Sequence, residues 1–365
     1  MYLKSLSLYN FKNHSESIFK FEKSINCFIG ENGAGKTNIL DAVHYLCLTK
    51  SYFNHIDSHN IQFDKDYFMI TGDVLSNEKK YKLQCNVERG KGKAIKIDKS
   101  FYKRFSDHIG RFPLIIISPT DSNLIIETSD IRRRYIDSNI SQYNKTYLKN
   151  LISYNKILKQ RNALLKQFSE KGNFDLESIE TYDDQLIKYG EEIYKERLGF
   201  LKRITPVFQE YYKGISDNKE SVSLIYKTQL NDSKIEDLLK KNLSTDMRLQ
   251  RTTVGIHKDD IDFQMDGRSV KRTASQGQQK SFLMSLKLAY FDLLSEELKI
   301  KPFLLLDDIF DKLDENRVQK LMDFVNKGKF GQVFITDTDK VRSERILNLS
   351  TTPSQIFEIS EGKLL

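Results

Sequence analysis

The feature that most constrains this chain is a complete phosphate-binding loop at residues 30–37, with the sequence GENGAGKT. The apolar run at 25–29 predicts a strand that leads into it. Gly30 and Gly35 allow the tight turn in which successive N–H groups converge on phosphate oxygens. A helix that begins at Lys36 adds its positive dipole end. The loop therefore predicts ATP binding.

Each residue of this segment has an expected role in binding the nucleotide. Lys36 reaches the β- and γ-phosphates, and Thr37 binds Mg²⁺ through its hydroxyl. The run at 38–43 predicts that the helix continues. The expected contacts to ATP are Gly30, Glu31, Asn32, Gly33, Ala34, Gly35, Lys36, Thr37 and Asn38.

The chain has 365 residues, of which 39% are hydrophobic, enough for the core of one or two globular domains. No apolar run approaches the roughly 20 residues that span a bilayer, and the first residues lack the apolar stretch of a secretion signal. Cys27, Cys47 and Cys85 lie far apart and form no ligand-spaced set with histidine. We expect a cytoplasmic protein without membrane contact, disulfide framework or zinc site.

A formal net charge of +8 favours a polyanionic partner. Charge alone fits equally a solvated basic surface that only keeps the protein soluble. No helix-turn-helix, zinc finger or other base-reading motif is found, so contacts to DNA would be to phosphates, sensitive to salt and weakly dependent on sequence. The candidate DNA contacts are Arg132, Arg133, Arg134, Arg89, Lys91 and Lys93.

An acidic motif lies far along the chain at 303–308, where the apolar run FLLL ends in Asp307 and Asp308. Such a strand is typical of the centre of a parallel sheet, and nucleotide sites form at the carboxyl ends of these strands. We expect Asp307 to hold Mg²⁺ through water, and Asp308 to polarise the water that attacks the γ-phosphate. Alone, the pattern is more often a plain strand-to-loop exit; the phosphate-binding loop favours the catalytic interpretation.

A third motif, ASQGQQK at 274–280, precedes a run with helical spacing of apolar residues. It resembles the signature motif of ABC-type ATPases, in which Ser275, Gln276 and Gly277 bind a phosphate at a helix N-terminus. Because the chain has its own phosphate-binding loop, the phosphate bound by Ser275 is expected to come from a second subunit. The local alternative is a serine N-cap before an amphipathic helix.

The order of these motifs predicts an α/β fold, an ABC-type ATPase head with a mixed or parallel sheet. A loop at 309–314 is expected across a dimer interface, and a strand at 333–336 ends where many relatives have a histidine. In such heads two copies sandwich two ATP molecules, so we expect an ATP-dependent homodimer. The expected catalytic residues are Asp308, Lys36 and Ser275.

The middle of the chain predicts two amphipathic helices, because apolar residues recur at helical spacing over 147–168 and 186–208. A turn-like segment at 169–175 separates them, and Pro206 is expected to bend or end the second helix. The predicted domains are an ATPase head formed by 1–122 and 216–365 and an inserted compact helical domain at 123–215.

Four segments carry a resemblance to the RecF family of bacterial recombination-mediator ATPases. They are NFKNH at 10–14, IRRRYID at 131–137, VGIHKDD at 254–260 and ASQGQQK at 274–280. The first resembles a segment near the nucleotide in RecF and SMC-type heads, so the resemblance adds Lys12 and Asn13 to the expected contacts. Departures from the family pattern stand at Ser129, Ile256 and residues 311–312, and no glutamine follows 114–117 to stand beside Mg²⁺.

The resemblance implies an ATP-dependent dimer that binds duplex DNA near single-strand gaps, works with RecR and helps to load RecA during gap repair. It also implies a weak, DNA-stimulated ATPase, nucleoid-associated in the cytoplasm, whose slow hydrolysis releases the dimer.

Two other classes of ATPase are alternatives. A chromosome-structuring ATPase of SMC type needs long coiled-coil arms, for which the middle of the chain is too short. An ABC transporter subunit would have a glutamate at Asp308, a histidine near Thr336 and a glutamine after 114–117, and the sequence has none of these.

Overall fold

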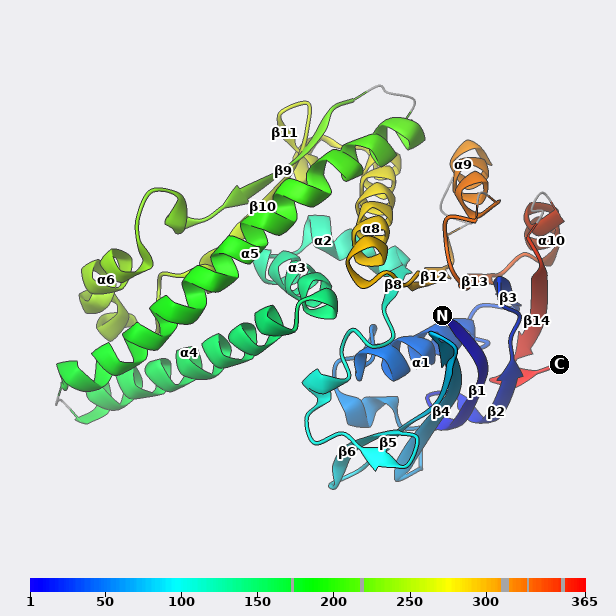
Figure 1. Ribbon diagram of the computed structural model, residues 1–365, viewed down its shortest axis with the longest axis horizontal. Helices are drawn as coiled ribbons and strands as arrows, with labels where there is room; N and C mark the ends of the chain where they lie inside the picture. The colour runs from blue at the N-terminus through cyan, green and yellow to red at the C-terminus, as the bar shows by residue number, and fades with distance from the viewer. Residues whose placement is uncertain (172–173, 217–219, 310–314, 327, 349–351) are drawn as a thin grey trace. The chain divides into compact units, whose positions relative to one another are not determined.

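The computed structural model covers residues 1–365 and describes all of them except 172–173, 217–219, 310–314, 327 and 349–351. Contacts between residues divide the chain into two compact units. The first, called the head, comprises Met1–Asp121 and Leu283–Leu365. The second, called the inserted unit, comprises Ser122–Phe282 (Figure 1).

The head contains a six-stranded sheet with the order β15-β14-β3-β13-β12-β8. Its strands are β3 (Ile25–Ile29), β8 (Leu114–Ile117), β12 (Phe303–Asp307), β13 (Val333–Asp337), β14 (Ser354–Ser360) and β15 (Lys363–Leu364). Neighbouring strands from β14 to β8 pair in parallel, and the short β15 pairs antiparallel with β14. All residues of β3, β12 and β13 are buried, as expected for the centre of a parallel sheet. Their carboxyl ends therefore meet at one edge, where nucleotide sites form.

A second, antiparallel sheet of the head has the order β2-β1-β4-β5-β6-β7. Its strands are β1 (Tyr2–Phe11), β2 (His14–Lys20), β4 (Tyr67–Ser76), β5 (Lys79–Glu88), β6 (Gly92–Ile97) and β7 (Ser100–Phe101). Every second residue of β4 is buried, so one face of this sheet packs on the core. The helix α1 (Lys36–Leu48) contacts strands of both sheets and is buried along almost its whole length.

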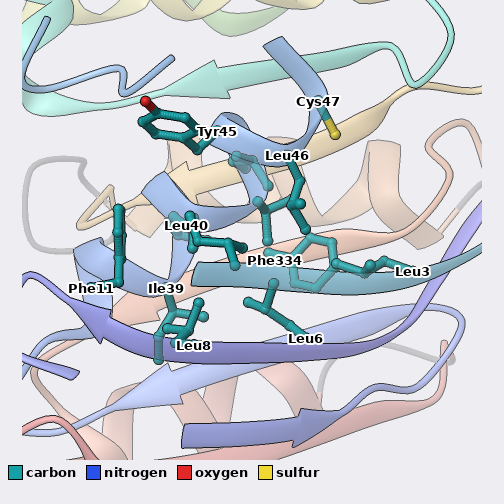
Figure 2. Close-up of a cluster of buried hydrophobic side chains, with 14 of the residues drawn as sticks. Leu3, Leu6, Leu8, Phe11, Ile39, Leu40, Tyr45, Leu46, Cys47 and Phe334 are labelled. Atoms are coloured by element: carbon teal, nitrogen blue, oxygen red, sulfur yellow. The ribbon is translucent and has the colours of Figure 1, made fainter. Parts of the chain in front are cut away.

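The core of the head fixes α1 in place from two sides. Figure 2 shows side chains of this core, which come from β1, α1 and β13 and include Leu3, Leu6, Leu8, Ile39, Leu40, Leu46 and Phe334. Each of these is at most 3% exposed. Full burial of one such side chain contributes about 1.5–3 kcal/mol. The start of α1, which carries the phosphate-binding loop, is thus anchored by apolar packing.

Shorter elements complete the head. They are η1 (Asp57–Asn60), η2 (Phe105–Asp107), η3 (Pro119–Ser122, at the boundary of the units), α9 (Glu315–Asn326) and α10 (Lys340–Asn348). The three cysteines are free and buried. Within the described part of the chain, no helix has both the length and the apolarity needed to cross a membrane.

The inserted unit is mainly helical. Its helices are α2 (Asn123–Ile126), α3 (Ser129–Tyr143), α4 (Lys145–Lys171), α5 (Leu176–Ser216), η4 (Gln229–Asn231), α6 (Ile235–Leu249), η5 (Ile256–Lys258), α7 (Val270–Thr273) and the start of α8 (Gln276–Leu298). A three-stranded sheet joins them, with the order β11 (Arg268–Ser269), β10 (Asp260–Met265) and β9 (Val222–Lys227). The two predicted amphipathic helices are confirmed as α4 and α5.

Pro206 was expected to bend or end the second helix, and it does not end it, because α5 continues through it to Ser216. A proline inside a helix removes one hydrogen bond and costs roughly 3 kcal/mol. The apolar stripe continues past it, with Phe208 and Tyr212 fully buried. Burial of these two rings offsets the cost of the proline.

The division into units differs from the predicted domains at one boundary, because residues 216–282 belong to the inserted unit rather than to the head. Side chains far apart in sequence explain this. Arg197 of α5 is 2% exposed and donates to Asp259 Oδ2 (3.1 Å), to the Ile256 oxygen (2.8 Å) and to Asp137 Oδ1 (2.9 Å). This buried arginine ties the family-like segment 254–260 to the helices of the inserted unit.

Candidate nucleotide-binding site

The phosphate-binding loop joins the end of β3 to the start of α1, as its sequence predicts. Gly33 and Gly35 have φ angles of 82° and 110°, in the left-handed region that favours glycine. The Nζ of Lys36 lies within the loop and donates to the carbonyl oxygens of Gly30 (2.8 Å) and Glu31 (2.7 Å). The lysine charge is therefore centred on the loop, where the β- and γ-phosphates are expected.

The carboxylate of Asp307, at the end of β12, accepts hydrogen bonds from three hydroxyl groups. Thr37 Oγ1 (2.7 Å) and Thr336 Oγ1 (2.9 Å) donate to Oδ1, and Ser118 Oγ donates to Oδ2 (3.3 Å). Burial raises the pKa of Asp307, and the hydroxyl hydrogen bonds and Lys36 oppose this rise. Burial lowers the pKa of Lys36, while the neighbouring carboxylates favour its charged form.

Thr37 and Asp307 fit the expected magnesium site. Hydroxyl and carboxylate oxygens are hard ligands of the kind that Mg²⁺ prefers. The two residues are 270 positions apart in sequence, and the fold places their oxygens at hydrogen-bond distance. The Mg²⁺ role of this pair remains a prediction that the geometry suits.

Asp308 follows directly after β12 in an unusual backbone conformation. Its φ angle is 47°, in the left-handed region, which costs on the order of 1 kcal/mol for a residue other than glycine. Its N–H donates to Thr336 Oγ1 (2.9 Å), and its carboxylate favours the charged form of Lys36. Strained residues of this kind cluster at functional sites, which favours the predicted catalytic position of Asp308.

Of the two residues added by the family resemblance, Asn13 contacts the loop directly. Its Nδ2 donates to the Gly33 oxygen (3.3 Å), and its Oδ1 accepts from Asn38 Nδ2 (2.7 Å). Lys12 instead forms an ion pair of 2.6 Å with Asp41, a fully buried residue of α1. The ammonium group of Lys12 is therefore held by the helix that follows the loop.

The signature-like residues Ser275, Gln276 and Gly277 belong to the inserted unit, whereas the loop and the acidic strand belong to the head. Ser275 caps α8: its Oγ accepts from the Gln278 N–H (3.3 Å), and its own N–H donates to Gln278 Oε1 (2.7 Å). This reciprocal pair is a capping box. The local cap is therefore present, and Ser275 and Gln276 are exposed at the helix start. The contact with a second subunit's phosphate remains a prediction.

The loop predicted to cross a dimer interface lies outside the described residues, apart from Ile309, which is buried.

The first basic cluster divides into structural and exposed members. Arg132 forms a two-point ion pair with Asp260 (2.7 and 3.0 Å), and Arg133 donates to the Asp259 oxygen (2.6 Å). Their side chains are 13% and 15% exposed. Arg134 is 55% exposed and pairs with Asp130 on the same helix. Arg132 and Arg133 therefore hold the inserted unit together, and Arg134 remains the candidate DNA contact of this cluster.

The second basic cluster divides in the same way. Lys93 is 13% exposed and donates to the Thr49 oxygen (2.6 Å) and to Asp57 Oδ2 (2.8 Å), so its role is structural. Lys91 is 76% exposed beside Glu88, and Arg89 is exposed. Arg89 and Lys91 remain candidate DNA contacts at the turn between β5 and β6.

Sequence reasoning missed Ser118 and Thr336, which both donate to Asp307. A signal existed, because each hydroxyl stands at the carboxyl end of a strand that pairs beside β12. Many ABC-type heads have a glutamine and a histidine at these two places. Hydroxyl groups stand there instead, and they donate hydrogen bonds to the acidic side chain.

The parallel sheet, the phosphate-binding loop at its edge and the hydroxyl-bonded Asp307 define a P-loop ATPase head of ABC type with an inserted helical unit. A family model described as the RecF/RecN/SMC N terminal domain matches residues 2–358. The chain belongs to the RecF family, as the following relatives show.

The DNA replication and repair protein RecF of Flavobacterium johnsoniae is 45% identical over 98% of this chain and 100% of that protein. Its namesake from Cytophaga hutchinsonii is 42% identical over 100% of this chain and 96% of that protein. A solved structure of the recombination mediator protein RecF with ATP, in the RecFOR pathway, is 30% identical, with a TM-score of 0.90 over 100% of this chain and 97% of that one. An Smc head domain from Pyrococcus furiosus is 16% identical with a TM-score of 0.59, which shows a shared fold.

Proposed function

We propose that this chain is an ATP-dependent DNA-binding protein of recombinational repair. The observation that carries the ATP-dependent part of the proposal is the 2.7 Å hydrogen bond from Thr37 to Asp307, which joins the phosphate-binding loop to the acidic strand end. The relatives of this chain are DNA replication and repair proteins. One similar solved structure is that of a recombination mediator protein of the RecFOR pathway with ATP.

In the proposed mechanism, each residue of the head acts on the triphosphate from a fixed place. Lys36 binds the β- and γ-phosphates. Thr37, and Asp307 through water, would hold Mg²⁺, which when bound would neutralise phosphate charge. Asp308 orients and polarises the attacking water. Ser275 of a second copy binds the γ-phosphate, so that two copies enclose two ATP molecules and hydrolysis separates them.

The proposed partner is duplex DNA beside a single-strand gap, bound through phosphates. The net charge of +8 and the exposed side chains of Arg89, Lys91 and Arg134 support this proposal. By analogy with relatives in the RecFOR pathway, the ATP-bound dimer works with RecR and helps to load the recombinase. Slow, DNA-stimulated hydrolysis then releases the dimer.

Sedimentation of the full chain tests the proposal, with and without ATP and Mg²⁺, and with and without gapped duplex. We expect a monomer without nucleotide, a dimer with ATP, and a dimer on DNA when both are added. Ser275→Arg serves as the matched variant and should bind ATP yet stay monomeric. A wild-type chain that stays monomeric with saturating ATP, Mg²⁺ and DNA contradicts the proposal.

A further inference from the structure

Three consecutive carbonyl groups of the phosphate-binding loop, those of residues 33–35, accept hydrogen bonds from outside the loop. Asn13 Nδ2 donates to the first (3.3 Å), the Gly362 N–H donates to the second (2.8 Å), and His14 Nε2 lies 3.1 Å from the third. Asn13 belongs to the turn between β1 and β2, His14 is the first residue of β2 directly after that turn, and Gly362 belongs to the turn between β14 and β15. Two hairpin turns therefore hold the loop from outside.

These bonds help to fix the direction of the N–H groups that are expected to face phosphate; the Gly35 oxygen also accepts from the N–H groups of Asn38 (3.0 Å) and Ile39 (3.3 Å) of α1. A trans peptide group is planar, with its C=O and the following N–H pointing in opposite directions. The second held carbonyl shares its peptide plane with the N–H of Gly35, and the third shares its plane with the N–H of Lys36. Holding both oxygens away from the site therefore points both N–H groups toward it.

We infer that His14 and Gly362, in the turn between β14 and β15, are positioning residues that hold the phosphate-binding loop of the nucleotide site. They act through the loop, because they hold its carbonyl groups and do not themselves face the phosphates. The inference rests on the proposed function and deepens it, since it adds the end of the chain to the ATP-binding machinery of the head.

The hydroxyl group of Ser17 lies between these two residues. Its Oγ is 2.8 Å from the Gly362 oxygen and 3.0 Å from His14 Nδ1, and its single hydrogen can be donated to one of them at a time. The Gly35 oxygen only accepts, so His14 Nε2 must carry a hydrogen to bond it. His14 is fully buried, and burial lowers its pKa, which favours the neutral ring with this one hydrogen. Nδ1 is then an acceptor, and Ser17 can donate to it or to Gly362.

Steric contacts show how closely the turns surround the loop. A Cβ at Gly362, where φ is 75°, would lie 2.2 Å from the Asn13 carbonyl oxygen. A Cβ at Gly35 would lie 2.7 Å from Asn13 Nδ2 and 2.9 Å from His14 Nε2. Real Cβ atoms do not approach so closely, so a side chain at either glycine would displace the turn or the loop.

The test measures binding of a fluorescent ADP analogue to the full chain without DNA. ADP lacks the γ-phosphate that the proposed dimer shares, so its affinity reports on one loop alone. His14→Ala should weaken ADP binding about tenfold, since a net hydrogen bond to the loop is lost. His14→Gln, whose Nε2 can still donate, should stay within about threefold of wild type. Ser17→Ala should fall between the two variants.

Gly362→Ala probes the C-terminal turn and should also weaken ADP binding by about tenfold. Leu365→Ala is the matched control, because Leu365 stands in the same hairpin and is 80% exposed. It should bind ADP as the wild type does. Urea unfolding of each variant identifies any that fails to fold. If His14→Ala or Gly362→Ala fails to fold, the ADP affinities of Ser17→Ala and His14→Gln test the inference in its place, with weaker binding expected for Ser17→Ala than for His14→Gln.

Wild-type ADP affinity in both His14→Ala and Gly362→Ala would overturn the inference and leave the proposed dimer untouched. Equal losses in His14→Ala and His14→Gln would also overturn it, because the donated hydrogen bond would then not matter. A wild-type chain that binds neither ADP nor ATP would overturn the inference and the proposed function together.

Discussion

Thr37→Val removes the hydroxyl that joins the phosphate-binding loop to Asp307. The lost bond is 2.7 Å long, and its acceptor belongs to a residue that is 4% exposed. Hydrogen bonds to charged groups contribute about 1.5–3 kcal/mol. Because Asp307 keeps its bonds from Thr336 and Ser118, we expect a loss of about 1.5 kcal/mol of unfolding free energy. For a unit of this size, that loss lowers the Tm by about 3–6 °C.

The same variant should also lose about tenfold of the gain in ATP affinity that Mg²⁺ provides. Loss of even an outer hydrogen-bond partner costs a metal site about 10–100-fold in affinity. The assay is ATP titration in Mg²⁺ and in EDTA. Thr336→Val is the matched control, because Thr336 donates to the same Asp307 oxygen (2.9 Å) from β13 and not from the loop. It should lower the Tm similarly but lose less of the Mg²⁺-dependent gain, because the Thr37 hydroxyl that would bind Mg²⁺ is still present. If Thr37→Val keeps this gain in full, the assignment of the magnesium site is wrong.

Three further predictions concern other parts of the chain. Asp308→Asn should keep ATP-driven dimerisation and lose phosphate release, and unchanged steady-state hydrolysis would refute its role in activating water. Arg132→Ala should lower the free energy of unfolding by about 1.5 kcal/mol through its partly buried pair with Asp260. Arg134→Ala should instead reduce the slope of log DNA affinity against log salt concentration by about one, without a change in Tm, and equal effects of the two variants on DNA binding would contradict the assignment. Burial lowers the pKa of His44 to about 4, so as pH falls the His44 ring is protonated in the unfolded chain before it is protonated in the folded one. The free energy of unfolding therefore decreases by about 3 kcal/mol between pH 6.5 and 4. His44→Asn should flatten this part of a Tm-against-pH curve, and an unchanged curve would show that other groups cause it.

The centre of the site was predictable because its pattern is local. A glycine-rich loop between a strand and a helix has few other uses, and parallel pairing brings the ends of buried strands to one edge. These two rules place Lys36, Thr37 and Asp307 together without knowledge of the rest of the fold. The inserted helices were predictable for the same reason, since helical periodicity is a local property.

The remaining features depend on partners that are distant in sequence. Arg132 and Asp260 are 128 positions apart, so a count of basic residues cannot distinguish a partly buried ion pair from an exposed cation. Pro206 breaks a local rule that tertiary burial overrides. Ser118 and His14 carry common side chains with no distinctive spacing, and their roles depend on which atoms the fold places beside them.

The central claim, that two copies share each ATP, is tested most directly by mixing two variants that are each inactive. Lys36→Ala removes the lysine side chain of the phosphate-binding loop. Ser275→Arg blocks the start of α8, where the signature-like residues lie. In a mixed dimer, the intact loop of one copy meets the intact Ser275 of the other, so one complete site forms. Mixing is therefore expected to restore ATP hydrolysis. If the mixture is as inactive as either variant alone, the shared site does not exist.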